Sequence, residues 1–251
     1  MIFLPMRKKQ FHFPPSILNI LELAIGIAVK QNLPIFVVGG FVRDFLLGVK
    51  NWDIDLVAES RDFKEGIEFA MALAKALNGE IETHRGFGTA VISYNFKGRE
   101  MRMDVANTRK ERYKKPAALP NVSPASIIED LERRDFSINA MAISLNESNP
   151  GLQLIDPFKG KEDLRRKRIR VLHNLSFIDD PTRILRAVRF AVRHNFCIER
   201  KTKRLIKEAI EKGMLKELKP QRLEKEIRLI LKEKKPMQVF SKLFALGEGD
   251  D

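Results

Sequence analysis

The chain has 251 residues, 44% of them hydrophobic, a net charge of +13 and one cysteine, Cys197. That length suits one large domain or two modest ones, and a single thiol excludes both a disulfide framework and a thiolate zinc site. No apolar run approaches the ~20 residues of a membrane span, and Met1–Phe13 lacks the apolar core of a signal peptide, so we expect a cytoplasmic protein without membrane association.

The first elements predicted are a helix and a buried strand. Apolar residues recur at helical spacing over Ser16–Gln31, with Ser16 as the expected N-cap. An apolar run, Ile35 to Val38, then predicts a strand that ends at Gly39-Gly40. Paired glycines let the backbone approach a ligand closely, and the amides that open the next short helix attract phosphate. Taken alone, the glycine pair is more typical of an ordinary turn.

A second strand-like run carries Asp53 and Asp55. Residues i and i+2 of a strand point to the same side, so two carboxylates about 6–7 Å apart at Cα can grip one divalent cation or bridge a pair. An exposed strand end also accounts for such a pair. The order of strand, Gly-Gly, Arg-Asp and second strand favours phosphoryl or nucleotidyl transfer. Neither G-x-G-x-x-G nor a P-loop is present, so a dinucleotide fold has no support.

A helix and three strands are expected next. The strand over Met101–Val105 carries Asp104, a residue disfavoured inside strands, which makes it the candidate third carboxylate of a two-metal site. We assign no chemistry to His84, because a lone histidine near a turn is more often structural. The other predicted elements are a helix over Phe63–Leu77 and strands over Glu80–His84 and Thr89–Tyr94.

The middle of the chain is predicted to be a loop followed by a helix. Lys114–Ser126 is rich in Pro and Lys and predicts an irregular loop. Leu131–Leu145 has apolar residues at helical spacing, which predicts an amphipathic helix whose charged first turn, Arg133-Arg134-Asp135, faces a ligand. A Pro/Gly turn at Asp156–Gly160 then indicates a hinge.

Two basic segments follow. Arg183, Arg186, Arg189 and Arg193 share one face of a helix that Asp180 and Pro181 begin. A solvated arginine stripe is the plain interpretation, but four arginines with no glutamate on the same face repel one another and favour an anionic partner. Arg200–Lys235 contains 14 Lys or Arg against six Glu. That segment suits RNA or DNA, although a solvated lysine-rich face would look the same.

The string GGFVRD followed by DID resembles the polymerase-β-like nucleotidyltransferases, and within them the bacterial class of tRNA CCA-adding enzymes and poly(A) polymerases. RRD at Arg133, DP-x-x-G-x-x-DL at Asp156, DDPTR at Asp179 and the helix after Gln221 are similar to later motifs of that class, in the same order. The resemblance covers roughly residues 35–236. It implies an α+β fold, a mixed-sheet head with flanking helices and then an all-helical neck, divided as 1–34 lead-in, 35–158 head and 159–251 neck.

The resemblance also implies roles for individual residues. Asp53, Asp55 and Asp104 would hold two Mg²⁺ ions, and Asp135 would contact the ribose. Asp180 and Arg183 would recognise the base, although Asp179 stands where the family usually has Glu. The triphosphate would be bound by Gly39, Gly40, Arg43, Arg134, Arg186 and Arg189.

The activity implied is template-independent addition of C, A or both to the 3′ end of tRNA from CTP and ATP. Poly(A) polymerisation is an alternative with the same motifs. A non-catalytic RNA-binding fragment is an alternative of another class, because the basic neck would bind RNA without chemistry. Full-length family members continue into body and tail regions that hold tRNA.

Overall fold

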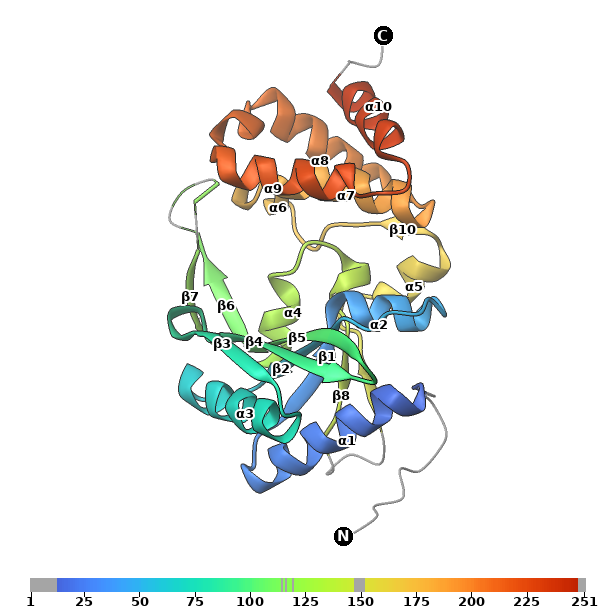
Figure 1. Ribbon diagram of the computed structural model, residues 1–251. Coiled ribbons are helices and arrows are strands. Elements are labelled where there is room, and N and C mark those ends of the chain that lie inside the picture. Colours follow the sequence, from blue (N-terminus) through green and yellow to red (C-terminus); the bar gives the residue numbers. More distant parts are fainter. Residues whose placement is uncertain (1–12, 114, 116, 119, 147–151, 248–251) are drawn as a thin grey trace. The chain divides into compact units, whose positions relative to one another are not determined.

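A computed structural model describes residues 13–113, 115, 117–118, 120–146 and 152–247 (Figure 1). Residues 1–12, most of the segment predicted to lack a signal peptide, lie outside the described residues. So do residues 114, 116 and 119 of the predicted loop. No described helix is both long and apolar enough to cross a membrane. The chain folds into two compact units and passes between them repeatedly. The sheet unit comprises Met1–Lys110, Val122–Glu132 and Asn139–Pro157; the helical unit comprises Glu111–Asn121, Arg133–Ile138 and Phe158–Asp251.

The sheet unit is built on a mixed sheet with the strand order β3-β4-β5-β2-β1-β8-β9. β2 and β5 run parallel, and the other pairings described for this sheet are antiparallel. The strands are β1 Ile35–Val38, β2 Ile54–Ala58, β3 Glu80–His84, β4 Thr89–Phe96, β5 Arg99–Asn107, β8 Ala142–Ser144 and β9 Gln153–Ile155. The predictions for β1 and β3 are confirmed to the residue, and β4 and β5 extend the predicted strands.

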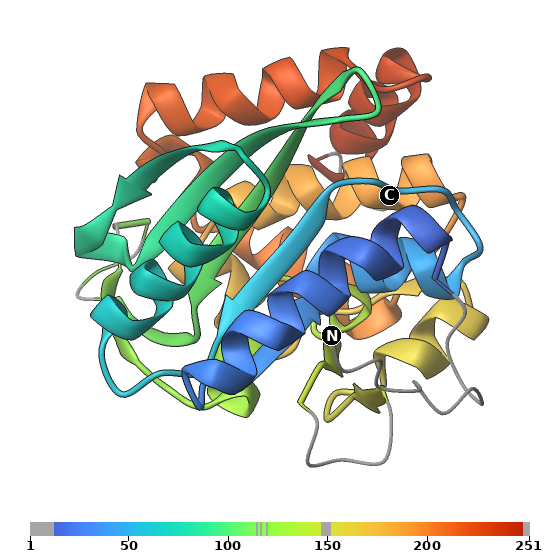
Figure 2. The same cartoon turned by 60° about the horizontal axis from the view of Figure 1, so that its bottom comes forward.

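Helices cover the sheet because their apolar faces need burial. α1 and α3 lie side by side on one face of the sheet (Figure 2). The helices of this unit are α1 Pro15–Lys30, α2 Gly39–Leu46, α3 Phe63–Ala76 and α4 Ile127–Glu132, with 3₁₀ turn η1 Arg85–Phe87. Ser16 is not the N-cap of α1, because the helix begins one residue earlier at Pro15, whose fixed φ suits a first helical position. α3 has the expected side-chain cap, since Asp62 accepts from the amides of Lys64 and Glu65.

The predicted helix over Leu131–Leu145 is wrong. α4 stops at Glu132, a 3₁₀ turn (η2) follows at Ser137–Asn139, and β8 then pairs with β1. The chain crosses between units at both ends of 133–138. Side-chain contacts replace helical bonds there: Asp135 Oδ1 accepts from the Phe136 amide at 2.8 Å, and Ser137 Oγ donates to Asp163 at 2.6 Å. Apolar spacing alone could not reveal that the segment serves two units.

The helical unit packs its helices around a core that includes Phe136, Phe177, Ile184 and Val188. A small parallel pair, β10 Arg168–Ile169 and β11 Cys197–Ile198, interrupts the helices. The strands β6 Arg109–Arg112 and β7 Asn121–Pro124 pair with each other, so part of the predicted loop is a strand. The remaining helices are α5 Gly160–Arg165, α6 Ser176–Asp179, α7 Thr182–His194, α8 Arg200–Glu211, η3 Met214–Glu217, α9 Pro220–Leu231 and α10 Pro236–Gly247.

Candidate active site

Two of the predicted carboxylates are neighbours across the sheet. Asp55 on β2 and Asp104 on β5 are register partners in the parallel pairing of these strands. Adjacent strands lie about 4.8 Å apart, and register partners in parallel strands point to the same face. Asp104 is exposed and Asp55 is half-buried, while the residues on either side of Asp55 in the strand, Ile54 and Leu56, are buried. β2 and β5 thus present a pair of acids at one face of the sheet.

Asp53 lies just before β2 and is exposed. Among the residues that the structure describes, no three His, Cys, Asp or Glu side chains are already gathered closely enough to hold a metal ion. The donor set nevertheless fits Mg²⁺, which takes hard oxygen ligands and usually uses one or two carboxylates completed by water and substrate phosphates. Asp55 and Asp104 are such a pair, and Asp53 is a third oxygen donor two residues away in sequence.

The Gly-Gly turn begins α2. Gly39 has a φ of 70°, a conformation that favours glycine, and its amide donates to the Met141 carbonyl at 3.3 Å. Its contribution is therefore the turn itself. A Cβ on Gly40 would be 3.5 Å from the Arg43 guanidinium, which is ordinary contact. Gly40 lies in the first turn of α2, where backbone amides are available to an anion.

Arg43 is a buried member of a polar network within the sheet unit. Its side chain is 4% exposed; Nε donates to Asp44 Oδ1 at 2.8 Å and Nη1 donates to Asn139 Oδ1 at 2.7 Å. Asn51 Nδ2 donates to the other oxygen of Asp44 at 2.9 Å, and Asn51 Oδ1 accepts from the Asp53 amide at 2.9 Å. A continuous series of hydrogen bonds thus joins the buried arginine to the backbone of Asp53.

The arginines of α7 lie in the helical unit and are matched by carboxylates. Arg186 binds Asp135 through Nε and Nη2 at 2.9 and 2.6 Å, and its Nη1 lies 3.5 Å from Glu226 on α9. Arg189, 3% exposed, contacts Glu226 at 3.3 Å and Glu233 at 3.4 Å. The repulsion expected along this face is therefore offset at Arg186 and Arg189 by carboxylates from elements distant in sequence. The burial of Arg189 places it inside this cluster.

The two residues expected to recognise the base are held by neighbours. Asp180 Oδ1 accepts from the amide and hydroxyl of Thr182, at 3.0 and 2.6 Å, and pairs with Arg222 at 2.8 Å. It therefore makes the expected capping contact, although α7 begins one residue later than predicted. Arg183 is buried and donates to Ser176 Oγ at 2.7 Å and to the Arg133 carbonyl at 2.6 Å.

A further series of contacts supports Arg183 within the helical unit. The Arg133 side chain binds Glu111 at 2.9 Å, and Glu111 accepts from the Tyr113 hydroxyl at 2.9 Å. Burial and then the Glu111 charge raise the pKa of Tyr113, so its hydroxyl stays protonated as a donor. Burial also raises the pKa of Asp179, against the opposing charges of His173 and Arg183. Burial would lower the pKa of Arg186, but Asp135 and Glu226 outweigh it and the net shift is upward.

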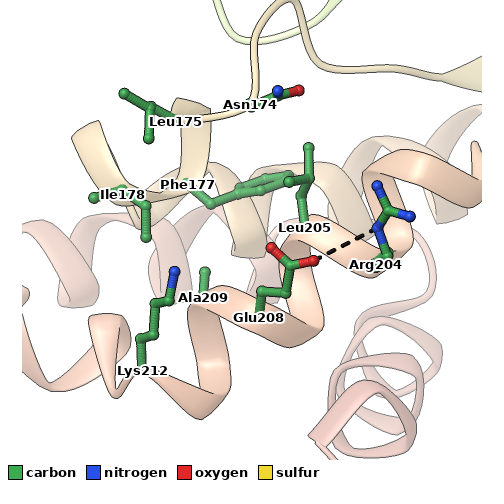
Figure 3. A pocket seen from close by; sticks show the side chains of 9 residues that line it. All are labelled: Asn174, Leu175, Phe177, Ile178, Arg204, Leu205, Glu208, Ala209 and Lys212. Carbon is green, nitrogen blue, oxygen red and sulfur yellow. Dashed lines mark ion pairs between the residues drawn. The ribbon is translucent and has the colours of Figure 1, made fainter.

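The helical unit also contains a cavity of about 250 Å³ between α6 and α8. Phe177 and Leu205 line it together with the charged residues Arg204, Glu208 and Lys212, and Figure 3 marks the ion pair of Arg204 and Glu208, 3.5 Å apart. None of the residues that line it is a predicted site residue. The cavity is thus separate from the candidate site.

Sequence reasoning missed the polar partners. Asn51 stands two residues before Asp53, the spacing of an Asx-turn, and this spacing was the available signal. No local pattern predicts that Glu226 and Glu233 pair with α7, because those contacts join residues 37 and 44 positions apart.

Comparisons with known proteins identify the family of the chain. The family model described as "Poly A polymerase head domain" matches residues 35–170. The chain is 42% identical over 250 residues to an A-adding tRNA nucleotidyltransferase of Geobacter sulfurreducens, covering 97% of this chain and 28% of that protein. It is 47% identical over 204 residues to the A-adding tRNA nucleotidyltransferase of Aquifex aeolicus, covering 81% of this chain and 24% of that protein.

A solved structure described as the apo form II of a CCA-adding enzyme is also similar, with a TM-score of 0.84 and 47% identity. The match covers 93% of this chain and 53% of that chain. The predicted α+β fold, a mixed sheet with flanking helices followed by helices, is therefore confirmed. The chain spans about a quarter of the two curated relatives and about half of the solved one.

Proposed function

The chain belongs to the poly A polymerase head domain family, and we propose that it transfers AMP from ATP to the 3′ end of tRNA without a nucleic-acid template. A addition is the activity shared by the A-adding relatives and the CCA-adding neighbour. The observation that carries the proposal is the register pairing of Asp55 with Asp104, with Asp53 just before the same strand. A protein that only bound RNA would gain nothing from adjacent carboxylates, which repel phosphate.

The three carboxylates would hold two Mg²⁺ ions in the active protein. When bound, the ions supply charge neutralisation at the α-phosphate and lower the pKa of the attacking 3′-hydroxyl. The positions of Asp53, Asp55 and Asp104 would determine where the bound ions place their positive charge. The position of Gly40 in the first turn of α2 supports a phosphate contact through its backbone amide.

The helical unit would bind the rest of the nucleotide. Arg134 and Arg186 are both half-buried rather than fully buried, which supports contact with the triphosphate. Arg43 and Arg189 are buried, and each would contribute positive charge from within its own unit. Asp135 would accept from the ribose hydroxyl while it holds Arg186.

Asp180 and Arg183 would select the base. A carboxylate accepts from the exocyclic amino group that adenine and cytosine share, and a guanidinium donates to the neighbouring ring nitrogen. The contacts of Thr182, Arg222 and Ser176 to this pair hold both side chains in place. Such a fixed pair replaces a template base and excludes bases that lack the amino group.

Exposed cations support tRNA as the acceptor. α8 presents Lys201, Lys203 and Arg204 to solvent, and such a row suits an RNA backbone. Binding through these residues is expected to weaken steeply as salt is added.

The test is single-nucleotide extension of tRNA transcripts that end in CC or lack CCA altogether, each with ATP alone and then CTP alone. We expect one A on the transcript ending in CC. Incorporation of two C residues on the shorter transcript would extend the proposal to CCA addition. Long A tails on unrelated RNA would replace it by poly(A) polymerisation, and RNA binding with no extension would contradict it.

A further inference from the structure

We propose that Asn51 is a positioning residue that sets the direction of the Asp53 carboxylate. This inference rests on the proposed function, because it takes Asp53 as a ligand of the catalytic metal. Asn51 lies in the connection between α2 and β2 and makes two hydrogen bonds there. Its Oδ1 accepts from the Asp53 amide at 2.9 Å, and its Nδ2 donates to Asp44 Oδ2 at 2.9 Å.

The chemistry of the partners fixes the orientation of the Asn51 amide. A backbone N–H can only donate and an ionised carboxylate can only accept. The side-chain oxygen must therefore face Asp53 and the nitrogen must face Asp44. Asparagine and glutamine offer this acceptor and donor on one planar amide, and asparagine has the length of an Asx-turn.

The other end of the network is buried and rigid. Asp44 Oδ1 also accepts from Arg43 Nε at 2.8 Å, and Arg43 Nη1 donates to Asn139 Oδ1 at 2.7 Å. Arg43, Asp44 and Asn139 are all buried residues. Asp44 additionally holds the same connection through its backbone, since its carbonyl accepts from the Val49 amide at 2.9 Å. Asn51 thus joins the buried network of Arg43, Asp44 and Asn139 to the exposed Asp53.

Asp53 needs such a link because the sheet does not hold it. Pairing between β2 and β5 begins at Ile54 with Met103. Asp53 and Asp55 carry like charges, and Asp55 is the register partner of Asp104, so repulsion favours turning Asp53 away when no cation is present. An amide held by Asn51 keeps the backbone of Asp53 in one conformation before metal arrives, which is how outer groups support metal ligands.

The test compares Asn51→Ala with a matched control in the full chain. Asn95→Ala removes a similar hydrogen bond, from the Gly98 amide to Asn95 Oδ1 at 2.9 Å, in a turn of the same unit. Mn²⁺ is titrated alone and its free concentration is followed by electron paramagnetic resonance. We expect Asn51→Ala to weaken Mn²⁺ binding about tenfold, and Asn95→Ala to leave it unchanged. Asn51→Ser, which can keep the turn but cannot reach Asp44, should fall between wild type and Asn51→Ala.

The kinetic signature separates positioning from loss of structure. Asn51→Ala should lower kcat for AMP transfer and leave the KM for ATP and the thermal midpoint near wild type. Equal Mn²⁺ binding by Asn51→Ala and wild type would overturn the inference. Asp53→Ala separates this failure from a failure of the proposed function: if it also binds Mn²⁺ normally, the metal assignment itself is wrong.

Discussion

At the scale of single residues, the negative charges that the proposed function requires lower the stability of the sheet that carries them. Asp55 and Asp104 are register partners on adjacent strands, and like charges directly opposite each other destabilise a sheet. Arg102 lies 3.8 Å from Asp104, but both side chains are largely exposed, so solvent screens this pair. Residues that lower stability in this way are typical of active sites.

Asp104→Asn tests this conflict. Removing one charge should raise the free energy of unfolding by about 0.2–1 kcal/mol, while AMP transfer falls by about a hundredfold or more because a metal-ligand charge is lost. Urea unfolding and the tRNA extension assay measure the two effects. Glu100→Gln, an exposed change on the same strand, should alter neither. Lower stability together with wild-type activity would reverse both expectations.

At the scale of elements, the helical unit is held by ion pairs that join α7 to Glu226 on α9 and to Glu233, which follows α9 in the chain. Glu226 is buried and contacts both Arg186 and Arg189. Glu233 contacts Arg189 and also pairs with Arg193. These pairs fix the α7 helix that carries Arg183, the residue proposed to contact the base.

Glu226→Gln should destabilise the chain by about 3 kcal/mol, near the low end for a broken buried pair because both arginines keep a second carboxylate. Glu224→Gln is the control on the same helix, since the exposed pair of Glu224 with Arg228 should contribute about 0.5 kcal/mol or less. Chemical denaturation measures both changes. Similar losses for the two variants would argue against the buried cluster.

Glu233 gives this cluster a pH dependence. Burial alone would raise its pKa, but hydrogen bonds and charge from Arg193 and Arg189 outweigh it and lower the pKa below the ordinary 4.5. The carboxylate therefore stabilises the fold above pH 4.5, and that contribution is lost as pH falls through the lowered folded pKa. Urea midpoints between pH 7 and pH 3 should decline less in Glu233→Gln than in wild type. Equal declines of the urea midpoint in wild type and Glu233→Gln would contradict the pH dependence assigned to Glu233.

The sequence predicted elements well where local pattern decides them. The order of strand, Gly-Gly turn, helix and second strand is correct, and Asp104 lies on the neighbouring strand as expected. The helix over Leu131–Leu145 failed because that segment belongs partly to each unit. The pairing of the α7 arginines with Glu226 and Glu233 could not be predicted, because these residues lie far along the chain and long-range pairing leaves no local signal.

At the scale of the whole molecule, neither unit is a continuous stretch of chain. Glu111–Asn121 and Arg133–Ile138 belong to the helical unit, although they are flanked by segments of the sheet unit. Phe136 is fully buried, and its ring lies 6.0 Å from that of Phe190 in the same unit. The last crossing follows Pro157, so a cut there would not separate complete domains.

A fragment of residues 1–157 is therefore expected to fold poorly. It would carry Phe136 and its neighbours without α7, which supplies Phe190. Binding of the dye ANS should be much stronger than for the full chain, because apolar surface stays exposed. The full chain should unfold in one cooperative transition. A 1–157 fragment with native-like stability and no ANS binding would show that the units fold independently.

The central claim is that the carboxylates of β2 and β5 are the catalytic acids of nucleotide transfer to RNA. The most direct measurement is the single-turnover rate of AMP transfer to a tRNA ending in CC, for wild type and for Asp55→Asn with unchanged circular dichroism. We expect one added A by the wild-type chain and no detectable extension by the variant. Extension by Asp55→Asn at the wild-type rate would contradict it.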